Sequence, residues 1–270
     1  MFEQGAFINS VKITDDFDLE KLRVSGQCFR IKLLPDEVYR FIKGCHVLDM
    51  KMSDHAVYDI SVSDEEFADI WHDYFDLDRN YESIRATIDS ADTYLSAAAE
   101  SGKGIRILRQ EPWECLISFI ISQRKNIPAI TAAVEAVCKS AGCEIGGTGE
   151  YEFPGVEAMR AFSDEQWKAF KLGYREKYIR RAVAEAPDMD SLTGLSDDAL
   201  MEKLTGMYGV GIKVASCTAL FAYSRVDLAP VDVWIKRVFD EQYDGEDILS
   251  GRANAGILQQ YLFYHARVSK

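Results

Sequence analysis

The pattern of hydrophobic residues changes along the chain, from alternation with polar residues near the start to helical periodicity after about residue 60. Short alternating or β-branched runs, bounded by turn residues such as Pro35 and Gly44, predict strands in the first part. These runs cover residues 6–13, 29–33, 38–42, 45–50 and 56–60. They predict a small antiparallel sheet with a meander order.

From about Asp64 onward the pattern is helical. Ser63 and Glu66 have the spacing of a capping box, which marks a helix start. Residues 112–121 are apolar almost all round, which predicts a buried central helix with Pro112 in its first turn. Further helices are expected at 130–138, 164–170, 174–184, 196–204, 213–223, 231–239 and 253–267. The predicted fold is α+β, with a sheet domain and flanking helices over 1–98 and a helical domain over 99–270.

Within the helical part, residues 204–215 join two predicted helices through a short glycine turn, which predicts a helix–hairpin–helix at about 197–223. Gly209 and Gly211 flank a single valine, so the backbone can turn sharply and present its N–H groups outward. Such groups at the start of a helix bind phosphate, with help from the helix dipole. The alternative is a plain C-cap followed by a new helix.

Lys213 follows this turn, and Asp232 follows 19 residues later. A lysine amine is a nucleophile only when deprotonated, a form that partial desolvation favours, and the neighbours of Lys213 are apolar. Asp232 comes just after Pro230 and Val231, at the predicted first turn of a helix, where the dipole and backbone N–H groups keep a carboxylate ionised. A nucleophile beside an anion suits the cleavage of a base from deoxyribose.

The net charge of −13 argues against a nucleic-acid partner, but the charge is unevenly distributed. Residues 51–100 hold 13 acidic and three basic residues, whereas residues 168–181 hold six basic residues and one acidic residue. Residues 101–110 add three basic residues and no acid. We therefore expect a local basic face suited to phosphate, with a solvated helix face as the alternative.

Composition excludes several other classes. A hydrophobic content of 47% with no apolar run of about 18 residues predicts a globular protein with no membrane span. Residues 1–7 lack the basic and apolar parts of a secretory signal, so we expect an intracellular protein of the cytoplasm and nucleoid, or of the nucleus in a eukaryote. Its six cysteines and four histidines show no metal-ligand spacing, and no cysteine follows Cys217. Buried reduced thiols are expected, and neither a metal nor another cofactor.

The hairpin with Lys213 and Asp232 resembles the helix–hairpin–helix DNA glycosylases, and more narrowly the 8-oxoguanine DNA glycosylase/lyase family. The likeness extends from about Phe17 to the C-terminus. It includes Ser-Gly-Gln-Cys-Phe-Arg at 25–30, Ile-Leu-Arg-Gln-Glu-Pro at 107–112, Leu-Gly-Tyr-Arg at 172–175, and Gln259 four residues before Phe263.

This resemblance implies a monomer that acts on double-stranded DNA containing 8-oxoguanine. Lys213 would attack the anomeric carbon, form a Schiff base and allow β-elimination, while Asp232 would stabilise the transition state. The lesion would first be flipped into a pocket. There the Gly26 carbonyl would accept the N7 hydrogen, Phe263 would stack on the base, Gln259 would contact its Watson–Crick edge, and Cys217 would line the other side.

For the opposite strand, the resemblance implies that Tyr174 wedges into the helix and that Arg175 contacts the partner cytosine. Asn126 matches the family's Asn-Asn-Asn-Ile-x-Arg run, but Arg124 replaces its void-filling asparagine and Ala129 its arginine. We therefore expect weak opposite-base selectivity. Two further departures, Tyr208 for proline and Trp234 for histidine, remove no catalytic group.

Three alternatives remain at this stage. A non-catalytic DNA-binding module would use the hairpin only to bind phosphate. The presence of both Lys213 and Asp232 disfavours this alternative. An endonuclease III-type or adenine glycosylase is disfavoured by the missing cysteine cluster and by the segment at 25–30. A monofunctional alkylbase glycosylase would not need Lys213.

Overall fold

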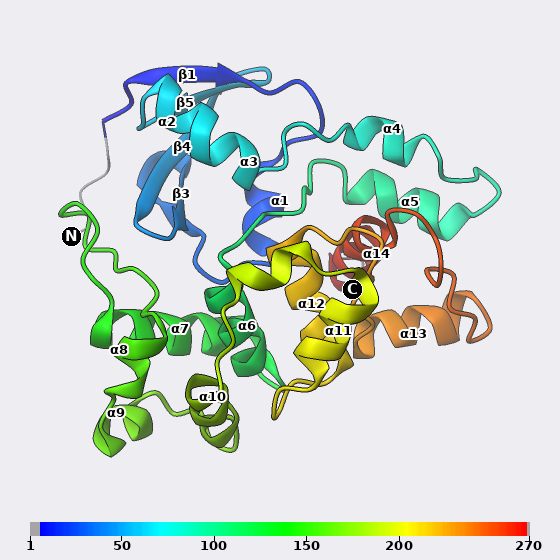
Figure 1. Cartoon of the computed structure of the whole chain (residues 1–270). Coiled ribbons are helices and arrows are strands. Elements are labelled where there is room, and N and C mark those ends of the chain that lie inside the picture. The colour runs from blue at the N-terminus through cyan, green and yellow to red at the C-terminus, as the bar shows by residue number, and fades with distance from the viewer. Residues whose placement is uncertain (1–5, 269–270) are drawn as a thin grey trace.

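The computed structural model describes residues 6–268 and has a sheet beside a larger helical body (Figure 1). The sheet order is β1-β5-β4-β3-β2, and every pair of neighbours is antiparallel. Its strands are β1 (Asn9–Lys12), β2 (Lys32–Leu34), β3 (Val38–Lys43), β4 (His46–Asp54) and β5 (Val57–Ile60). The predicted antiparallel sheet and α+β class are therefore confirmed.

The first strand is the exception to the meander. Strands β2 to β5 follow one another in space, but β1 pairs with β5 at the opposite edge from β2. Between β1 and β2 the chain forms α1 (Leu19–Val24), capped by Asp18, whose carboxylate accepts from the Lys21 N–H at 2.9 Å. The sequence did not predict this helix, because six residues are too few to show a helical period. A 3-10 turn, Pro35–Glu37, links β2 to β3.

Aromatic residues cover the apolar side of the sheet. They come from a short helical run made of α2 (Asp64–Glu66), η2 (Phe67–Trp71) and α3 (His72–Tyr74). Phe75 packs edge-on against Phe41 of β3, with ring centroids 5.0 Å apart, and both are fully buried. Ser63 caps this run by accepting from the Glu66 N–H, as predicted. The Glu66 carboxylate, however, accepts from the Trp71 indole at 3.4 Å, so the capping box is only half formed.

The helical body contains every helix predicted from residue 112 onward. Its helices are α4 (Tyr81–Arg85), α5 (Thr93–Ser101), α6 (Pro112–Ser122), α7 (Ile127–Ala141), α8 (Val156–Arg160), α9 (Asp164–Ala169), α10 (Arg175–Ala184), η3 (Asp190–Gly194), α11 (Asp197–Thr205), α12 (Ile212–Tyr223), α13 (Val233–Gln242) and α14 (Ala255–Val268). Helix α6 is buried from Cys115 to Ile121, which confirms its central place. It packs against α7, α10 and α12.

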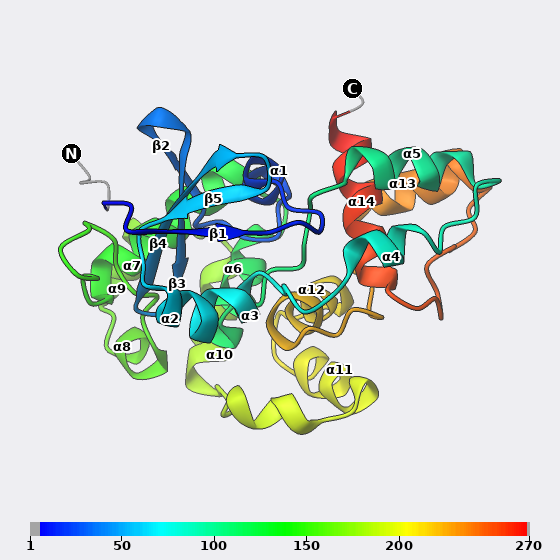
Figure 2. The ribbon, with the colours of Figure 1, turned by 90° about the horizontal axis from the view of Figure 1, so that it is seen from above.

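The buried apolar residues form two clusters. One lies between the sheet and residues 67–75, and the other fills the helical body. Helices α4 and α5 contribute to the second cluster, and α5 lies beside α14 (Figure 2). The domain division at residue 98 stays a prediction.

Two sequence expectations concern membranes and export. Within residues 6–268, no helix is long and apolar enough to cross a membrane. The N-terminal segment 1–7, from which no secretory signal was expected, lies mostly outside the described residues.

Candidate active site

The glycine turn between α11 and α12 has the geometry that the sequence predicted. Gly209 has φ +86°, a left-handed conformation, and a Cβ there would overlap the Tyr178 ring. Val210 donates its N–H to the Met207 carbonyl at 3.1 Å, closing the turn. Gly211 is the N-cap of α12, whose first backbone N–H groups have no partner within the helix. The turn therefore ends in a helix N-terminus of the kind that binds anions.

Lys213 and Asp232 lie at the first turns of two different helices. Lys213 belongs to α12, is partly buried, and places its Nζ 4.8 Å from the centroid of the Phe119 ring. Asp232 is the N-cap of α13, and its Oδ1 accepts from the N–H groups of Trp234 at 2.9 Å and Ile235 at 3.0 Å. The prediction that backbone N–H groups hold this carboxylate is confirmed. Its charge is thereby fixed in place.

Cys217 follows Lys213 by one helical turn and is only 3% exposed. Burial raises the pKa of its thiol, while the charge of Lys213 and a hydrogen bond with it act in the opposite direction. The charge of Asp232 raises the pKa further. The three side chains line one small recess.

Gly26 approaches this region from the segment between α1 and β2. Its φ of +81° is left-handed, and a Cβ there would lie 3.2 Å from Cε1 of Phe263. Its neighbour Gln27 is fully buried, donates to the Arg106 carbonyl at 2.8 Å, and accepts from the Leu108 N–H at 2.8 Å. The Ser-Gly-Gln segment is thus bound to the main chain that leads into α6. Only glycine fits here without strain.

Helix α14 supplies another wall. Gln259 is 3% exposed and its Oε1 accepts from the Gln260 amide at 2.9 Å. Phe263 lies one turn further, with the guanidinium carbon of Arg267 5.2 Å from its ring centroid. The predicted helical spacing of Gln259 and Phe263 is therefore present.

These residues share one hollow. A cavity of about 310 Å³ is lined by Gly26, Lys213, Asp232 and Phe263. A smaller recess of about 30 Å³, lined by the same four residues, adds Cys217 and Gln259. All six predicted catalytic and base-binding residues thus meet, although they come from four separate segments.

Asn126, a predicted DNA-binding residue, also lines the cavity. The further lining residues were not singled out as site residues from the sequence: Phe29, Phe119, Ser122, Lys125, Ile127, Ile130, Trp234 and Arg267. Arg267 donates to the Val24 carbonyl at 3.1 Å, and burial lowers the pKa of its guanidinium. It lies four residues after Phe263 and so shares its helix face, a spacing by which it could have been found.

Two of the predicted DNA-contacting residues, Arg124 and Tyr174, line a groove of about 600 Å³ that adjoins the cavity and shares Lys213 with it. Asn126 lines the cavity itself, whereas Arg175, Gly209 and Gly211 line neither hollow. Arg124 is exposed with φ +52°, and Tyr174 is 44% exposed. Asn126 caps α7, accepting from the Ala129 N–H at 2.9 Å. The turn between α6 and α7 therefore faces the side from which a substrate would enter.

Arg175 differs from its neighbours because it points inward. It is 7% exposed, and its Nε donates to the Gln123 carbonyl at 2.6 Å. Its other nitrogens donate to the carbonyls of Gln123 and Leu172. Contact with a partner base would require these bonds to be released.

The basic residues at 101–110 correct one expectation from the charge pattern. Arg106 is fully buried and its guanidinium donates to main-chain carbonyls, including that of Phe75 at 2.9 Å. Arg109 pairs with the carboxylates of Asp73 and Asp76. The expectation that both add to a phosphate-binding face is wrong, because these guanidinium groups bind the segment that precedes α6 to residues 15–16 and 73–79 instead.

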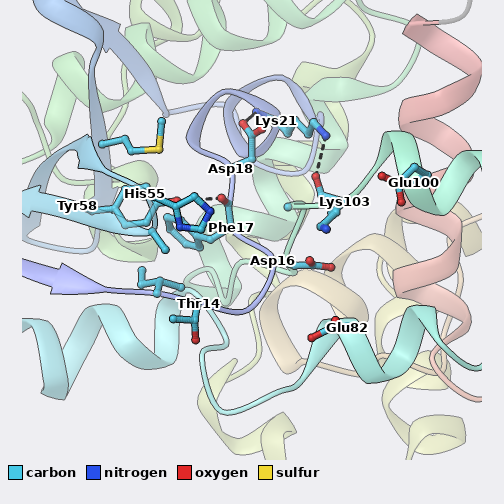
Figure 3. A pocket seen from close by; sticks show the side chains of 14 residues that line it. Thr14, Asp16, Phe17, Asp18, Lys21, His55, Tyr58, Glu82, Glu100 and Lys103 are labelled. Atoms are coloured by element: carbon cyan, nitrogen blue, oxygen red, sulfur yellow. Dashed lines mark hydrogen bonds between the residues drawn. The ribbon is translucent and has the colours of Figure 1, made fainter.

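A larger hollow, of about 720 Å³, opens between the sheet edge, α1 and α5 (Figure 3). Charged side chains line much of it, among them Asp18, Lys21 and Lys103. Asp18 caps α1, and Lys21 donates to the Lys103 carbonyl at 2.8 Å. No residue predicted for catalysis or base binding lines this hollow, so its size does not make it the active site.

Comparison with known proteins identifies the relatives of this chain. Residues 10–116 match the family model for the N-terminal domain of 8-oxoguanine DNA glycosylase. A probable N-glycosylase/DNA lyase of Methanothermobacter thermautotrophicus is 29% identical over 230 residues, which cover 72% of this chain and 73% of that protein.

Two solved structures cover nearly the whole chain. MBOgg1, solved in complex with a low-affinity DNA ligand, is 34% identical with a TM-score of 0.89, covering 100% of this chain and 98% of that one. The 8-oxoguanine glycosylase/lyase of Clostridium acetobutylicum, solved with double-stranded DNA containing cytosine opposite 8-oxoG, is 30% identical with a TM-score of 0.87, covering 97% and 99%. With these matches over nearly its whole length, this chain belongs to the 8-oxoguanine DNA glycosylase family.

Proposed function

We propose that this protein is a bifunctional DNA glycosylase and AP lyase that removes 8-oxoguanine from double-stranded DNA in base excision repair. One observation carries the proposal: Lys213, the N-capping carboxylate of Asp232 and the four predicted base-binding residues line one recess that adjoins the larger cavity. A non-catalytic DNA-binding module would not need a lysine and a carboxylate in the same recess as a set of base contacts.

The chemistry follows from Lys213 and Asp232. The neutral Lys213 amine attacks C1′, a C–N bond forms, and the bond from C1′ to the base breaks with the base taking the electron pair and a proton. The charge of Asp232, fixed by two N–H groups, stabilises the cationic sugar in the transition state. Ring opening gives a Schiff base, and β-elimination then cleaves the strand on the 3′ side.

Recognition of the base would follow from the other walls. The Gly26 carbonyl would accept the N7 hydrogen that 8-oxoguanine has and guanine lacks, and an unmatched polar group in a buried site is costly. Phe263 would stack on the flipped base, Gln259 would contact its Watson–Crick edge, and Cys217 would line the far side. The burial of Gln259 and Cys217 supports a pocket that excludes water.

Contacts to the DNA outside the pocket would come from the hairpin and from the mouth of the cavity. Backbone N–H groups at Gly209 and Gly211 would bind phosphate, and Tyr174 would fill the space left by the flipped base. Arg124 and Asn126 lie on the turn that would face the opposite strand. We propose a monomer that acts where genomic DNA lies, in the cytoplasm and nucleoid or, in a eukaryote, in the nucleus.

Borohydride trapping on duplex DNA containing 8-oxoguanine tests the main proposal, because only an amine nucleophile leaves a covalent adduct. Wild type should form the adduct and excise 8-oxoguanine from a panel of lesions, and Lys213→Gln should do neither. The matched control is Lys139→Gln, an exposed lysine on α7, which should behave as wild type. Unchanged excision of 8-oxoguanine by the Lys213→Gln variant would refute the proposal.

We further propose that opposite-base selectivity is weak. The inward orientation of Arg175 and the short side chain of Ala129 leave fewer groups at the cavity mouth to contact cytosine. Excision rates measured opposite C and opposite A should differ by less than about tenfold, or about 1.4 kcal/mol, which lies in the lower part of the range for one good bidentate contact. A strong preference for cytosine would defeat this part alone.

A further inference from the structure

Gln123 ends α6 and begins the turn that leads to α7. It is the C-cap residue, with φ −54° and ψ 117°, and the next residue, Arg124, takes a left-handed conformation. The turn lines the groove at the cavity mouth. Gln123 therefore lies between the buried central helix and the surface that would face DNA.

The side chain and the main-chain carbonyl of Gln123 are hydrogen-bonded to two different segments. Its side-chain Nε2 donates to the Gly209 carbonyl in the hairpin at 3.1 Å. Its main-chain carbonyl accepts from Arg175 Nε at 2.6 Å and from the Tyr174 hydroxyl at 3.4 Å. A carbonyl can only accept, so the amide nitrogen must be the group that faces Gly209.

A second contact joins the same two segments. The Tyr178 ring lies 5.6 Å from Tyr174 and 5.4 Å from Tyr208, edge-on to both. Tyr178 also fills the space beside Gly209 that a Cβ would occupy. The hairpin and the turn that carries Tyr174 are therefore packed as one unit, with Gln123 as its polar link to α6.

We infer that Gln123 is a positioning residue that couples the hairpin's hold on the DNA backbone to the insertion of Tyr174 into the helix. Its side chain fixes the hairpin carbonyl, so that the N–H groups on the other side of the turn face the phosphate. Its main-chain carbonyl accepts from Arg175 and Tyr174 and so holds them beside the groove that adjoins the cavity. The inference rests on the proposed function, because Tyr174 inserts only if a base is flipped.

A double-mutant cycle tests the coupling. The dissociation constant is measured for a duplex that carries a tetrahydrofuran abasic analogue, with wild type, Gln123→Met, Tyr174→Ala and the double variant. Methionine keeps the length of glutamine but cannot donate to Gly209. Each single variant should bind the analogue about tenfold more weakly than wild type. The double variant should bind only slightly more weakly than either single variant, because the effects of substitutions within one hydrogen-bonded network are not additive. Undamaged duplex, which offers no gap for Tyr174, should show a smaller loss.

Gln166→Met on α9 is the matched control, since this glutamine also bonds through its side chain, to Ser140 and to the Ser163 N–H, but lies on another helix. It should bind the analogue as wild type does. If Gln123→Met fails to fold, Gln123→Glu replaces it, since a carboxylate also lacks the donor. A roughly hundredfold loss in the double variant, or no loss in Gln123→Met, would overturn the inference. The cycle is measured by binding, so a protein that binds the analogue but gives no borohydride adduct would refute the proposed function and leave the coupling intact.

Discussion

Lys213 lies over the face of Phe119, with its Nζ 4.8 Å from the ring centroid. That ring is itself held on two sides, stacked on Phe221 at 5.5 Å and edge-on to Phe29 at 5.5 Å. An aromatic face attracts an ammonium group without offering it a hydrogen bond. The lysine therefore lies over an apolar aromatic surface in the same cavity as Asp232, with the Cys217 thiol as its hydrogen-bonding neighbour.

Asp232 has two separable tasks, capping α13 and supplying negative charge. Asp232→Asn should keep the cap, because asparagine caps as well as aspartate, and should leave the free energy of unfolding nearly unchanged. Asp232→Ala should lose about 1 kcal/mol of stability. Both should slow single-turnover excision of 8-oxoguanine by about a hundredfold, since both remove the charge. Thermal denaturation and excision rates together check this, and an Asn variant with wild-type excision would show that the charge is not needed.

Gly26 is expected to be sensitive to a single methyl group. In Gly26→Ala the left-handed backbone costs about 1 kcal/mol and the Cβ meets Phe263, so the carbonyl and the stacking ring shift. Excision should fall by at least about tenfold. Gly44→Ala is the control, because Gly44 also has a positive φ but no heavy atom within 4 Å of its Cβ position.

Both glycine variants should lose similar stability in denaturant titrations, and only Gly26→Ala should lose excision of 8-oxoguanine. Equal activity in the two variants would mean that contact with Phe263 does not shape the pocket. Equal loss of activity would mean that backbone strain alone is responsible.

The sequence predicted the elements that have a clear hydrophobic period. Helix α6 was recognisable from its apolar run, whereas Gln259 and Phe263 were identified through the family resemblance, and their spacing of four residues is compatible with one helix face. Helix α1 was missed because six residues carry too little periodicity. Gly26 could be joined to the lysine only through the family resemblance, because no local pattern predicts which segment of a sheet domain faces a helix of the other domain.

Arg175 and Gln123 show a second limit. The family resemblance implied that the Arg175 side chain contacts the partner cytosine. In the structure the guanidinium is bound by the carbonyl of Gln123, a group that every residue possesses. Contacts to the main chain depend on the path of the backbone, here set by the left-handed residue Arg124, and the side-chain pattern does not contain that information.

The cysteines should fall into two classes of reactivity. Cys45 and Cys143 are exposed, and the other four thiols are buried, which corrects the expectation that all are buried. Burial raises the pKa of Cys28 to about 11 and that of Cys138 to about 12, so at pH 8 these thiols hold less thiolate, the reactive form, than an ordinary cysteine. A thiol reagent should therefore modify two cysteines promptly in the native protein and six after denaturation. Rapid reaction of Cys217 would show that the recess beside Lys213 is open to solvent.

Ala129 offers a way to change selectivity for the opposite base. It is exposed in the first turn of α7, next to the Asn126 cap, at the position where the resemblance places an arginine. Ala129→Arg should raise the ratio of excision opposite C to excision opposite A by about tenfold, or about 1.4 kcal/mol, the lower range for a bidentate base contact. Ala132→Arg, an exposed position nearly one turn further along α7, adds the same charge and should improve binding to both duplexes alike. If the two variants change the ratio equally, charge alone explains the effect and Ala129 does not face the partner base.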